Sequence, residues 1–255
     1  MVTVMAEQFN AQRAEILAHL DTARIGKSYG RKPKGKQPTY TRKDWLQDLL
    51  DWAHAAESFK AAIQPIVHAT LMQAGQDAIT EVGMESSQFD PFTPAIVEYF
   101  QNRGMKIAKD VTDETEKQLR AALSKGVLEG QSTYELRAIV EDVMGSASTI
   151  RADRIARYEV THAQTYGDIQ AWSQSGLVEG KQWMTAEDEK VCPGCKSMDG
   201  KIIGLSENYF DQGDELVIDR PGRSTPYRLS LDYESIPGPG LHNGCRCVLL
   251  PVRAM

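Results

Sequence analysis

The sequence lacks the long apolar run that a membrane-spanning helix needs. No stretch of about 18 apolar residues occurs, although 41% of the 255 residues are hydrophobic. Residues 1–11 also lack the basic flank and apolar stretch that together mark a secretory signal peptide. These absences exclude a membrane-spanning chain. They predict a globular protein that folds in the cytoplasm, where thiols stay reduced.

Positive charge is scarce outside one segment. The net charge is −6, yet eight basic residues and no acid lie between Thr22 and Lys43, so the remainder of the chain carries −14. The eight are Arg24, Lys27, Arg31, Lys32, Lys34, Lys36, Arg42 and Lys43. A chain that is acidic elsewhere lacks the broad basic face of a dedicated duplex-DNA binder. Glycines and prolines predict a flexible basic loop over 22–43, which is either a solvated linker or a contact for nucleic acid or an acidic protein surface.

Apolar residues at three- and four-residue spacing predict helices through the first two-thirds of the chain. We expect an N-terminal helix over 1–21, a helical region over 44–145, and then a long helix that stops at Gly176. Pro65 is expected to kink or end the helix that contains it. Gly145 is expected to close the helix before it.

Regular structure is sparse after Gly180. The predicted strands are Lys181–Thr185, Lys201–Leu205, Leu216–Ile218 and Cys245–Val252. The stretch Pro221–Gly240, rich in proline and glycine, is predicted to be a long loop. The fold class is therefore α+β, with a mainly helical N-terminal part followed by a small mixed α/β module over 146–255. A module with so little regular structure needs another source of order.

Cysteine is absent from the first 191 residues, and all four cysteines fall in the last quarter of the chain. With one histidine they form five candidate metal ligands, which are Cys192, Cys195, His242, Cys245 and Cys247. A tight turn between two cysteines spaced by two residues can point both thiolates at one metal ion. The second group supplies an imidazole and two more sulfurs. A structural Zn²⁺ site takes four such ligands, so the sequence predicts a zinc site with one candidate to spare.

Other states of the cysteines remain open at this point. They could form disulfides, or stay reduced without a metal ion. The 46 residues between Cys195 and His242 exceed common zinc-finger spacings. A redox-active pair at Cys192 and Cys195 is not expected, because no strand and following helix are predicted around it. Metal binding would also help to fold a module that is poor in regular structure.

Several segments around the cluster carry a resemblance to a known family. They are Arg151–Glu159, then Trp183–Thr185, Asp188, Val191–Cys195 and Asp199–Gly200, and finally His242–Cys247. In order and spacing they resemble the Mu F-like minor head proteins of tailed bacteriophages, over roughly residues 115–252. Leu119–Arg120 and Gly130–Ser132 are similar to the stretch that precedes this domain in the family. The chain departs from the family at Tyr158, usually threonine, and at Asn243, usually proline; neither is a candidate ligand.

The resemblance implies a function in head morphogenesis. Such proteins enter the procapsid in few copies and associate with portal, capsid or scaffold proteins. Some act in DNA packaging or ejection. It also implies localisation in the virion after assembly in the host bacterial cytoplasm, and it makes the gap between Cys195 and His242 expected. The alternatives are a nucleic-acid-binding zinc protein that uses the basic loop 22–43, and a zinc-dependent hydrolase.

A hydrolase would need an open zinc position and a nearby carboxylate base, for which Asp188 and Glu159 are candidates. Four clustered sulfurs leave no such position, so no catalytic residue is assigned and we do not expect an enzyme. Arg246 lies between two candidate ligands and needs a partner if it is buried. We expect Glu159 of the long helix to pair with Arg246. His162 is expected to support the site or to lie on the helix surface.

Overall fold

The computed structural model describes residues 1–22, 50–129, 131, 133–220, 222, 224–242 and 244–253. These residues form two compact units. Unit 1 contains residues 1–65 and 99–153, and unit 2 contains residues 66–98 and 154–255. Apart from Thr22, the predicted basic loop 22–43 lies outside the described residues.

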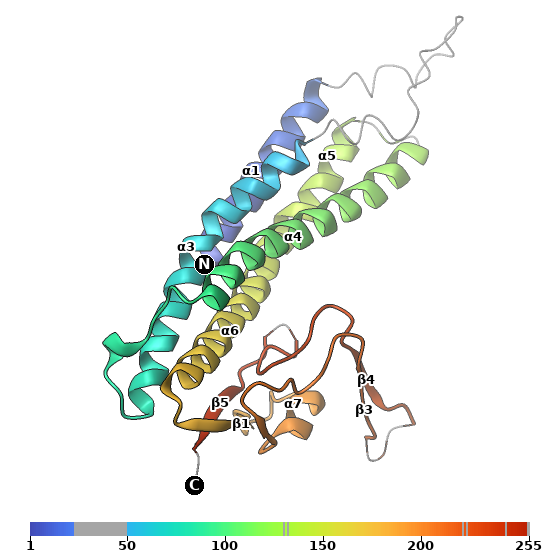
Figure 1. The fold of residues 1–255 in the computed structure, drawn as a ribbon. Helices are drawn as coiled ribbons and strands as arrows, with labels where there is room; N and C mark the ends of the chain where they lie inside the picture. The colour runs from blue at the N-terminus through green and yellow to red at the C-terminus, as the bar shows by residue number, and fades with distance from the viewer. Residues whose placement is uncertain are drawn as a thin grey trace, which may run out of the picture. The chain divides into compact units, whose positions relative to one another are not determined.

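Unit 1 is helical. Helix α1 (Val2–Thr22) lies along α3 (Trp52–Glu81) and α5 (Thr133–Glu141), with the rings of Phe9 and Phe59 5.7 Å apart (Figure 1). The core of this unit is a cluster of buried apolar side chains, most of them from these helices and from α4 (Pro94–Leu128). Its members are Ile16, Leu20, Leu50, Ala55, Leu119, Leu123, Leu136, Val140 and Met144. The helical spacing of these residues confirms that the apolar pattern of the sequence marks the buried faces.

Helix α3 continues through Pro65, so of the two predicted effects, a kink or an end, this residue does not end the helix. A proline inside a helix removes one backbone hydrogen bond and costs about 3 kcal/mol. Ile63 and Val67, on either side of it, are both buried. Burying one large apolar side chain contributes about 1.5–3 kcal/mol, so packing on both sides offsets the loss.

Helix α4 begins as the sequence indicates, with Thr93 capping the backbone N–H of Ile96 through its hydroxyl and Pro94 in the first turn. Gly145 does not close α5, because the chain passes through the π-helical turn Asp142–Ser146 directly into α6 (Ala147–Ser175). The predicted end of the long helix is confirmed. Gly176 follows α6 with φ of +63°, a conformation that glycine adopts without steric cost.

Unit 2 contains a three-stranded antiparallel sheet in the order β2-β1-β5. The central strand β1 (Val178–Met184) pairs with β2 (Ile202–Gly204) and with β5 (Val248–Arg253). A separate hairpin joins β3 (Glu215–Ile218) to β4 (Tyr227–Ser230). The short helix α7 (Pro193–Met198) contacts both strands of the hairpin. The predicted α+β fold class, with helices followed by a small strand-containing module, is confirmed.

Two predictions about strands are wrong. The stretch Pro221–Gly240 is not one loop, because it contains β4. The final strand starts at Val248, so Cys245 and Cys247 lie in the turn before it. Strand β4 is only four residues long and gains its order from pairing with β3, which no local pattern reveals.

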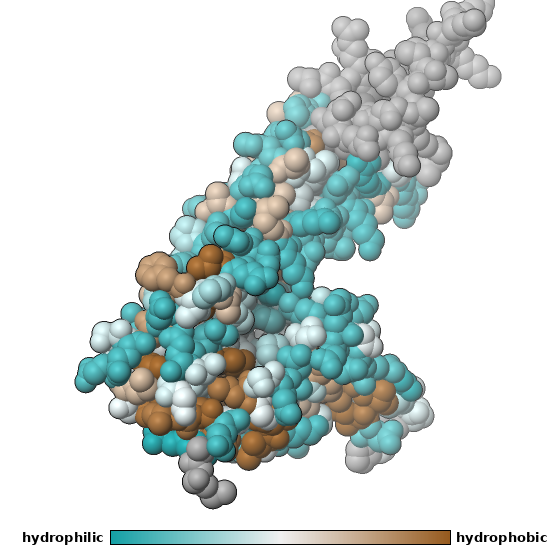
Figure 2. Space-filling model, viewed as in Figure 1, coloured by the Kyte–Doolittle hydropathy of each residue, from teal (hydrophilic) through white to brown (hydrophobic). Residues whose placement is uncertain are grey.

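The core of the strand-containing module joins the sheet, α7 and the hairpin. Its buried members are Trp183, Cys195, Met198, Leu216, Leu231, Ile236, Leu241, Cys245 and Cys247. Three of the four cysteines therefore belong to this core. Hydrophobic surface also shows over unit 2 in Figure 2, and exposed apolar residues of its strands include Ile202, Val217 and Val248. In the part of the chain that the structure describes, we find no helix with the length and apolar character to cross a membrane.

Candidate metal centre

Two segments that are far apart in the sequence bring the five candidate ligands together. Cys192 is the N-terminal cap of α7, with Pro193 in the first helical position and Cys195 in the first turn. The backbone N–H of Cys195 donates to the Cys192 sulfur at 3.2 Å. His242, Cys245 and Cys247 come from the turn that leads into β5. The expectation that no helix follows the first cysteine pair is therefore wrong, because α7 begins there.

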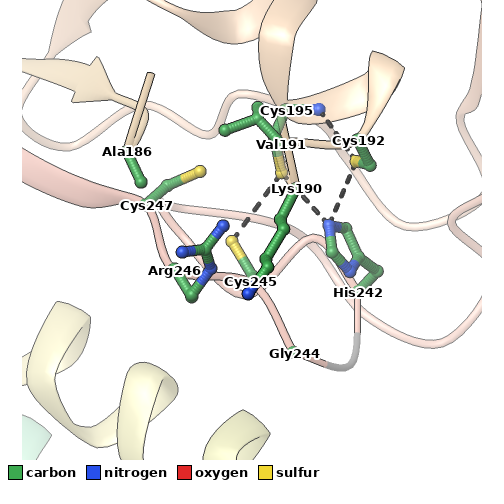
Figure 3. Close-up of a pocket in the computed structure, with 10 residues that line it drawn as sticks. All are labelled: Ala186, Lys190, Val191, Cys192, Cys195, His242, Gly244, Cys245, Arg246 and Cys247. Atoms are coloured by element: carbon green, nitrogen blue, oxygen red, sulfur yellow. Dashed lines mark hydrogen bonds between the residues drawn. The ribbon is translucent and has the colours of Figure 1, made fainter. Parts of the chain in front are cut away.

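The ligand atoms lie close together (Figure 3). His242 Nε2 is 3.1 Å from the Cys192 sulfur and 3.2 Å from the Cys195 sulfur. The sulfurs of Cys195 and Cys245 are 3.8 Å apart. In a tetrahedral zinc site with Zn–S bonds of about 2.3 Å, two sulfurs stand about 3.8 Å apart and a sulfur and a nitrogen about 3.5 Å. The sulfur–sulfur separation matches an edge of such a tetrahedron, and the two sulfur–nitrogen separations are a few tenths of an ångström shorter than its edge.

The five candidates form two overlapping groups that share Cys195. Cys192, Cys195 and His242 make up one group, and Cys195, Cys245 and Cys247 the other, with all ligand atoms of a group within 4.8 Å of one another. In Figure 3 the sulfurs of Cys192, Cys195 and Cys245 gather near the His242 ring, and the Cys247 sulfur points toward them from the Ala186 side. Both groups consist of Cys and His only.

Hydrogen-bond donors and apolar side chains surround the sulfurs. Cys195, Cys245 and Cys247 are buried, and Cys192 is partly exposed. The backbone N–H groups of Gly240 and Cys247 are close enough to the Cys245 sulfur to lower the pKa of that thiol. The fully buried indole of Trp183 lies beside Cys247. Backbone donors of this kind stabilise sulfur in its charged form, which is the form that binds metal.

Protons are shared unevenly among the four thiols. Hydrogen bonds from the Cys195 thiol and the His242 ring lower the pKa of Cys192 to about 4, against the effect of burial. Hydrogen bonds from Cys195 and Cys247 lower the pKa of Cys245 in the same way. The pKa of Cys195 is raised because its proton is held by the thiolates of Cys192 and Cys245. The Cys195 hydrogen bond lowers the pKa of Cys247, but Cys245 and burial together raise it to about 11.

This sharing fits a cation site. Without a cation, only part of the cluster can carry negative charge, because buried thiolates at these distances repel one another. A bound divalent ion removes that limit and deprotonates the coordinating thiols outright. Sulfur and imidazole donors at tetrahedral separations are the set that Zn²⁺ prefers. The cluster can therefore hold a metal ion.

The disulfide alternative does not match the structure. All four cysteines are free thiols, and the Cys195 and Cys245 sulfurs stand 3.8 Å apart, whereas a disulfide bond measures about 2.05 Å. The helix after Cys192 is a feature of redox-active pairs. The presence of two more sulfurs and an imidazole at the same place still favours a metal ion.

Arg246 pairs with Asp188, so the predicted pair of Arg246 with Glu159 is wrong. The Arg246 guanidinium donates to both carboxylate oxygens of Asp188, one of them at 2.6 Å, which lowers the pKa of that carboxyl. The prediction assumed that Arg246 is buried, but its side chain is exposed. Asp188 lies in the turn before Cys192, and it is this acid that pairs with Arg246 in place of Glu159. Glu159 is buried on α6.

The remaining polar candidates have structural contacts. Asp199 accepts hydrogen bonds from the backbone N–H and the hydroxyl of Thr185, both at 2.9 Å. His162 is buried on α6, with Nε2 3.2 Å from Glu234. The sequence analysis missed Glu234 altogether. The only signal for it was Tyr158, the position that departs from the family pattern, because the Tyr158 hydroxyl donates to Glu234 at 2.7 Å.

Comparison with known proteins places the chain in a family. The family model described as "Phage Mu protein F like protein" matches residues 117–250, which is more than half of the chain and includes all five candidate ligands. Searches of curated proteins and of solved structures give no match. The family is one of structural proteins of phage head morphogenesis. The predicted resemblance is confirmed, and the chain belongs to the phage Mu protein F-like family.

Proposed function

We propose that this protein is a minor head protein that binds other proteins of the phage capsid, the portal among them, while the head assembles in the host cytoplasm. The observation that carries the proposal is the family match over residues 117–250. The match includes the strand-containing module from β1 to Leu250, which lies within β5. A protein of this kind acts through surfaces and needs a stably folded module more than it needs a reactive group.

In this proposal a structural Zn²⁺ ion stabilises the fold of the strand-containing module. Its ligands are Cys192, Cys195, His242 and Cys245. Three distances support the choice, which are those of His242 to Cys192 and to Cys195 and that of Cys195 to Cys245. Cys247 stays outside the coordination sphere, beside Trp183. The ion would tie the start of α7 to the turn before β5. In small metal-binding modules the free energy of binding serves as free energy of folding.

Two cysteine variants of the full chain test this ligand set. Elemental analysis of the purified protein is expected to find about one zinc per chain. Cys195→Ser should lose the zinc, whereas Cys247→Ser should keep it, since both changes remove one buried sulfur but only one removes a ligand. Equal loss in both variants would move Cys247 into the coordination sphere. A wild-type chain without metal and with freely titratable thiols would end the zinc proposal.

Particle composition tests the head function. Quantitative mass spectrometry of purified phage particles is expected to find the chain in few copies per head. Co-expression with the portal protein of the same phage is expected to give a complex that survives purification. A chain absent from both procapsids and mature particles would refute the proposal, whatever its zinc content.

The basic segment supports a second candidate, which is contact with DNA during packaging or ejection. Eight positive charges without an acid between Thr22 and Lys43 are the observation in its favour. Reversing three charges, as Lys32→Glu, Lys34→Glu and Lys36→Glu, should abolish salt-sensitive DNA binding if the candidate is correct. Salt-sensitive binding that the triple variant retains would argue against this segment. A hydrolase is the third candidate, and loss of an activity in Asp188→Ala with intact zinc content would favour it.

A further inference from the structure

One stripe of α6 faces the loop that leads to His242. Tyr158, His162 and Thr165 stand four and three residues apart, so they share one face of the helix. The loop is Glu234–Leu241, which comes between the β3–β4 hairpin and the ligand His242. All these residues belong to unit 2.

Side-chain contacts fix the first part of this loop. The Tyr158 hydroxyl donates to Glu234 Oε1 at 2.7 Å, and His162 Nε2 lies 3.2 Å from the same oxygen. The Tyr158 and His162 rings are stacked at a tilt, with centroids 4.6 Å apart. Only 10% of the His162 side chain and 18% of the Glu234 side chain are exposed, so water competes little for these contacts.

Backbone contacts fix the second part of the loop. The Thr165 hydroxyl donates to the carbonyl of Pro239 at 3.2 Å. A Cβ atom on Gly238 would stand 2.6 Å from Thr165, and one on Gly240 would stand 2.9 Å from the His162 ring. The glycines therefore let the loop backbone lie directly against α6.

The second part of the loop also contacts the segment that carries the ligands His242 and Cys245. A Cβ atom on Gly240 would stand 2.9 Å from the His162 ring, and the Gly240 backbone N–H is close enough to the Cys245 sulfur to lower the pKa of that thiol. Leu241 is fully buried, and its carbonyl accepts a hydrogen bond from the Tyr233 hydroxyl at 2.7 Å. His242 is the next residue, and its carbonyl accepts from the backbone N–H of Cys245 at 3.2 Å. His162 is thus linked to Cys245 through Gly240, and the chain runs from Gly240 through the buried Leu241 to His242.

We infer that Tyr158 and His162 of α6 are positioning residues of the metal centre, which hold His242 and Cys245 in place through Glu234 and Gly240. The inference rests on the proposed zinc site and adds α6 to it. Residues that orient metal ligands change metal affinity by about 10–100-fold when they are mutated. Because Tyr158 acts one contact further out, the low end of that range applies here, which is about tenfold.

The test measures zinc release from the full chain. Tyr158→Phe removes the hydroxyl that donates to Glu234, and Glu234→Gln replaces the charged acceptor with a neutral amide, which weakens this hydrogen bond; both changes keep the shape of the side chain. Each variant should release Zn²⁺ to a chromophoric chelator about tenfold faster than wild type. The double variant should be no faster than the single ones, because both changes break the same contact.

Tyr166→Phe is the matched control. It removes the same hydroxyl group from the same helix, but the Tyr166 hydroxyl donates to the carbonyl of Ala95, away from the loop. It should release zinc at the wild-type rate. A second readout is the visible absorption of the Co²⁺-substituted protein, which reports ligand geometry. It should change in Tyr158→Phe and stay unchanged in the control.

The outcomes separate this inference from the zinc proposal. A wild-type chain that binds neither Zn²⁺ nor Co²⁺ refutes the zinc site and the inference together. A wild-type chain that binds zinc, with Tyr158→Phe and Glu234→Gln at wild-type release rates, refutes the inference alone. Equal acceleration in Tyr166→Phe would also overturn it, because a general loosening of α6 would then explain the effect.

Discussion

Gly240 is the residue at which a single added methyl group should damage the metal centre most specifically. Its φ is +118°, a backbone conformation that residues other than glycine rarely adopt. In Gly240→Ala the new Cβ would also stand 2.9 Å from two atoms of the His162 ring. The variant therefore combines backbone strain with a steric clash, and the two contributions can be separated.

Gly213→Ala supplies the strain without the clash. Gly213 has φ of +99°, and nothing lies within 4 Å of the position of its Cβ among the described residues. Strain alone costs on the order of 1–3 kcal/mol. Overpacking against a fixed side chain costs about another 1–3 kcal/mol. Gly240→Ala should therefore destabilise the loop Glu234–Leu241 by about 2–6 kcal/mol, and Gly213→Ala its own turn by about 1–3 kcal/mol.

Hydrogen exchange of the zinc-loaded chain measures these costs locally, as the opening free energy of amides in 234–250. Removing the ring in a His162→Ala background should relieve the clash, so that adding Gly240→Ala there costs only the strain. This is a double-mutant cycle whose coupling energy should be about 1–3 kcal/mol. A cost of Gly240→Ala that is the same with and without the His162 ring would refute the reasoning.

Three further variants test other parts of the molecule. Burial, together with the negative charges of Glu81 and Asp77, raises the pKa of Asp168 to about 7. The folded state therefore binds this proton more tightly than the unfolded state does. As a result, the free energy of unfolding falls as the pH rises from about 4 to 7. Asp168→Asn should remove that fall, and its gain over wild type in urea unfolding at pH 8 is at most about 4 kcal/mol; a variant whose stability still falls over this pH range would contradict the assignment. Asp188→Ala should keep the zinc content and urea midpoint of wild type, because its pair with Arg246 is exposed. Lys181→Met should lower the urea midpoint, since the Lys181 amine donates to the carbonyls of Leu205 and Glu207, both at 2.7 Å, and a hydrogen bond from a charged group contributes about 1.5–3 kcal/mol. A midpoint equal to that of wild type would show that these two hydrogen bonds contribute nothing to stability.

The sequence was informative where a local pattern decides the structure. The helical periodicity of α6 and the glycine after it determine where this helix runs and ends. The spacing of Cys192 and Cys195, with the histidine and two cysteines near the C-terminus, identified the cluster that the structure brings together. Both features depend on residues close in sequence or on residue types that are rare elsewhere in the chain.

The sequence was uninformative where a structure depends on contacts between residues that are far apart in the sequence. Strand β4 depends on pairing with β3, and helix α3 depends on packing on both sides of Pro65. The choice of Asp188 over Glu159 as the partner of Arg246 required knowing that Arg246 is exposed. Glu234 was missed because a single acid in a loop has no pattern, and only its contacts with Tyr158 and His162 give it a function.

The 46 residues between Cys195 and His242 form a loop whose two ends meet at the proposed zinc ion. An ion that joins them acts as a crosslink, and closing a loop of about 50 residues in the unfolded chain corresponds to about 4 kcal/mol of conformational entropy. That entropy changes slowly with length, by about 0.6 kcal/mol for each doubling. The β3–β4 hairpin inside this loop can therefore accept inserted sequence at little thermodynamic cost, and it is the natural place to graft a peptide tag onto the module.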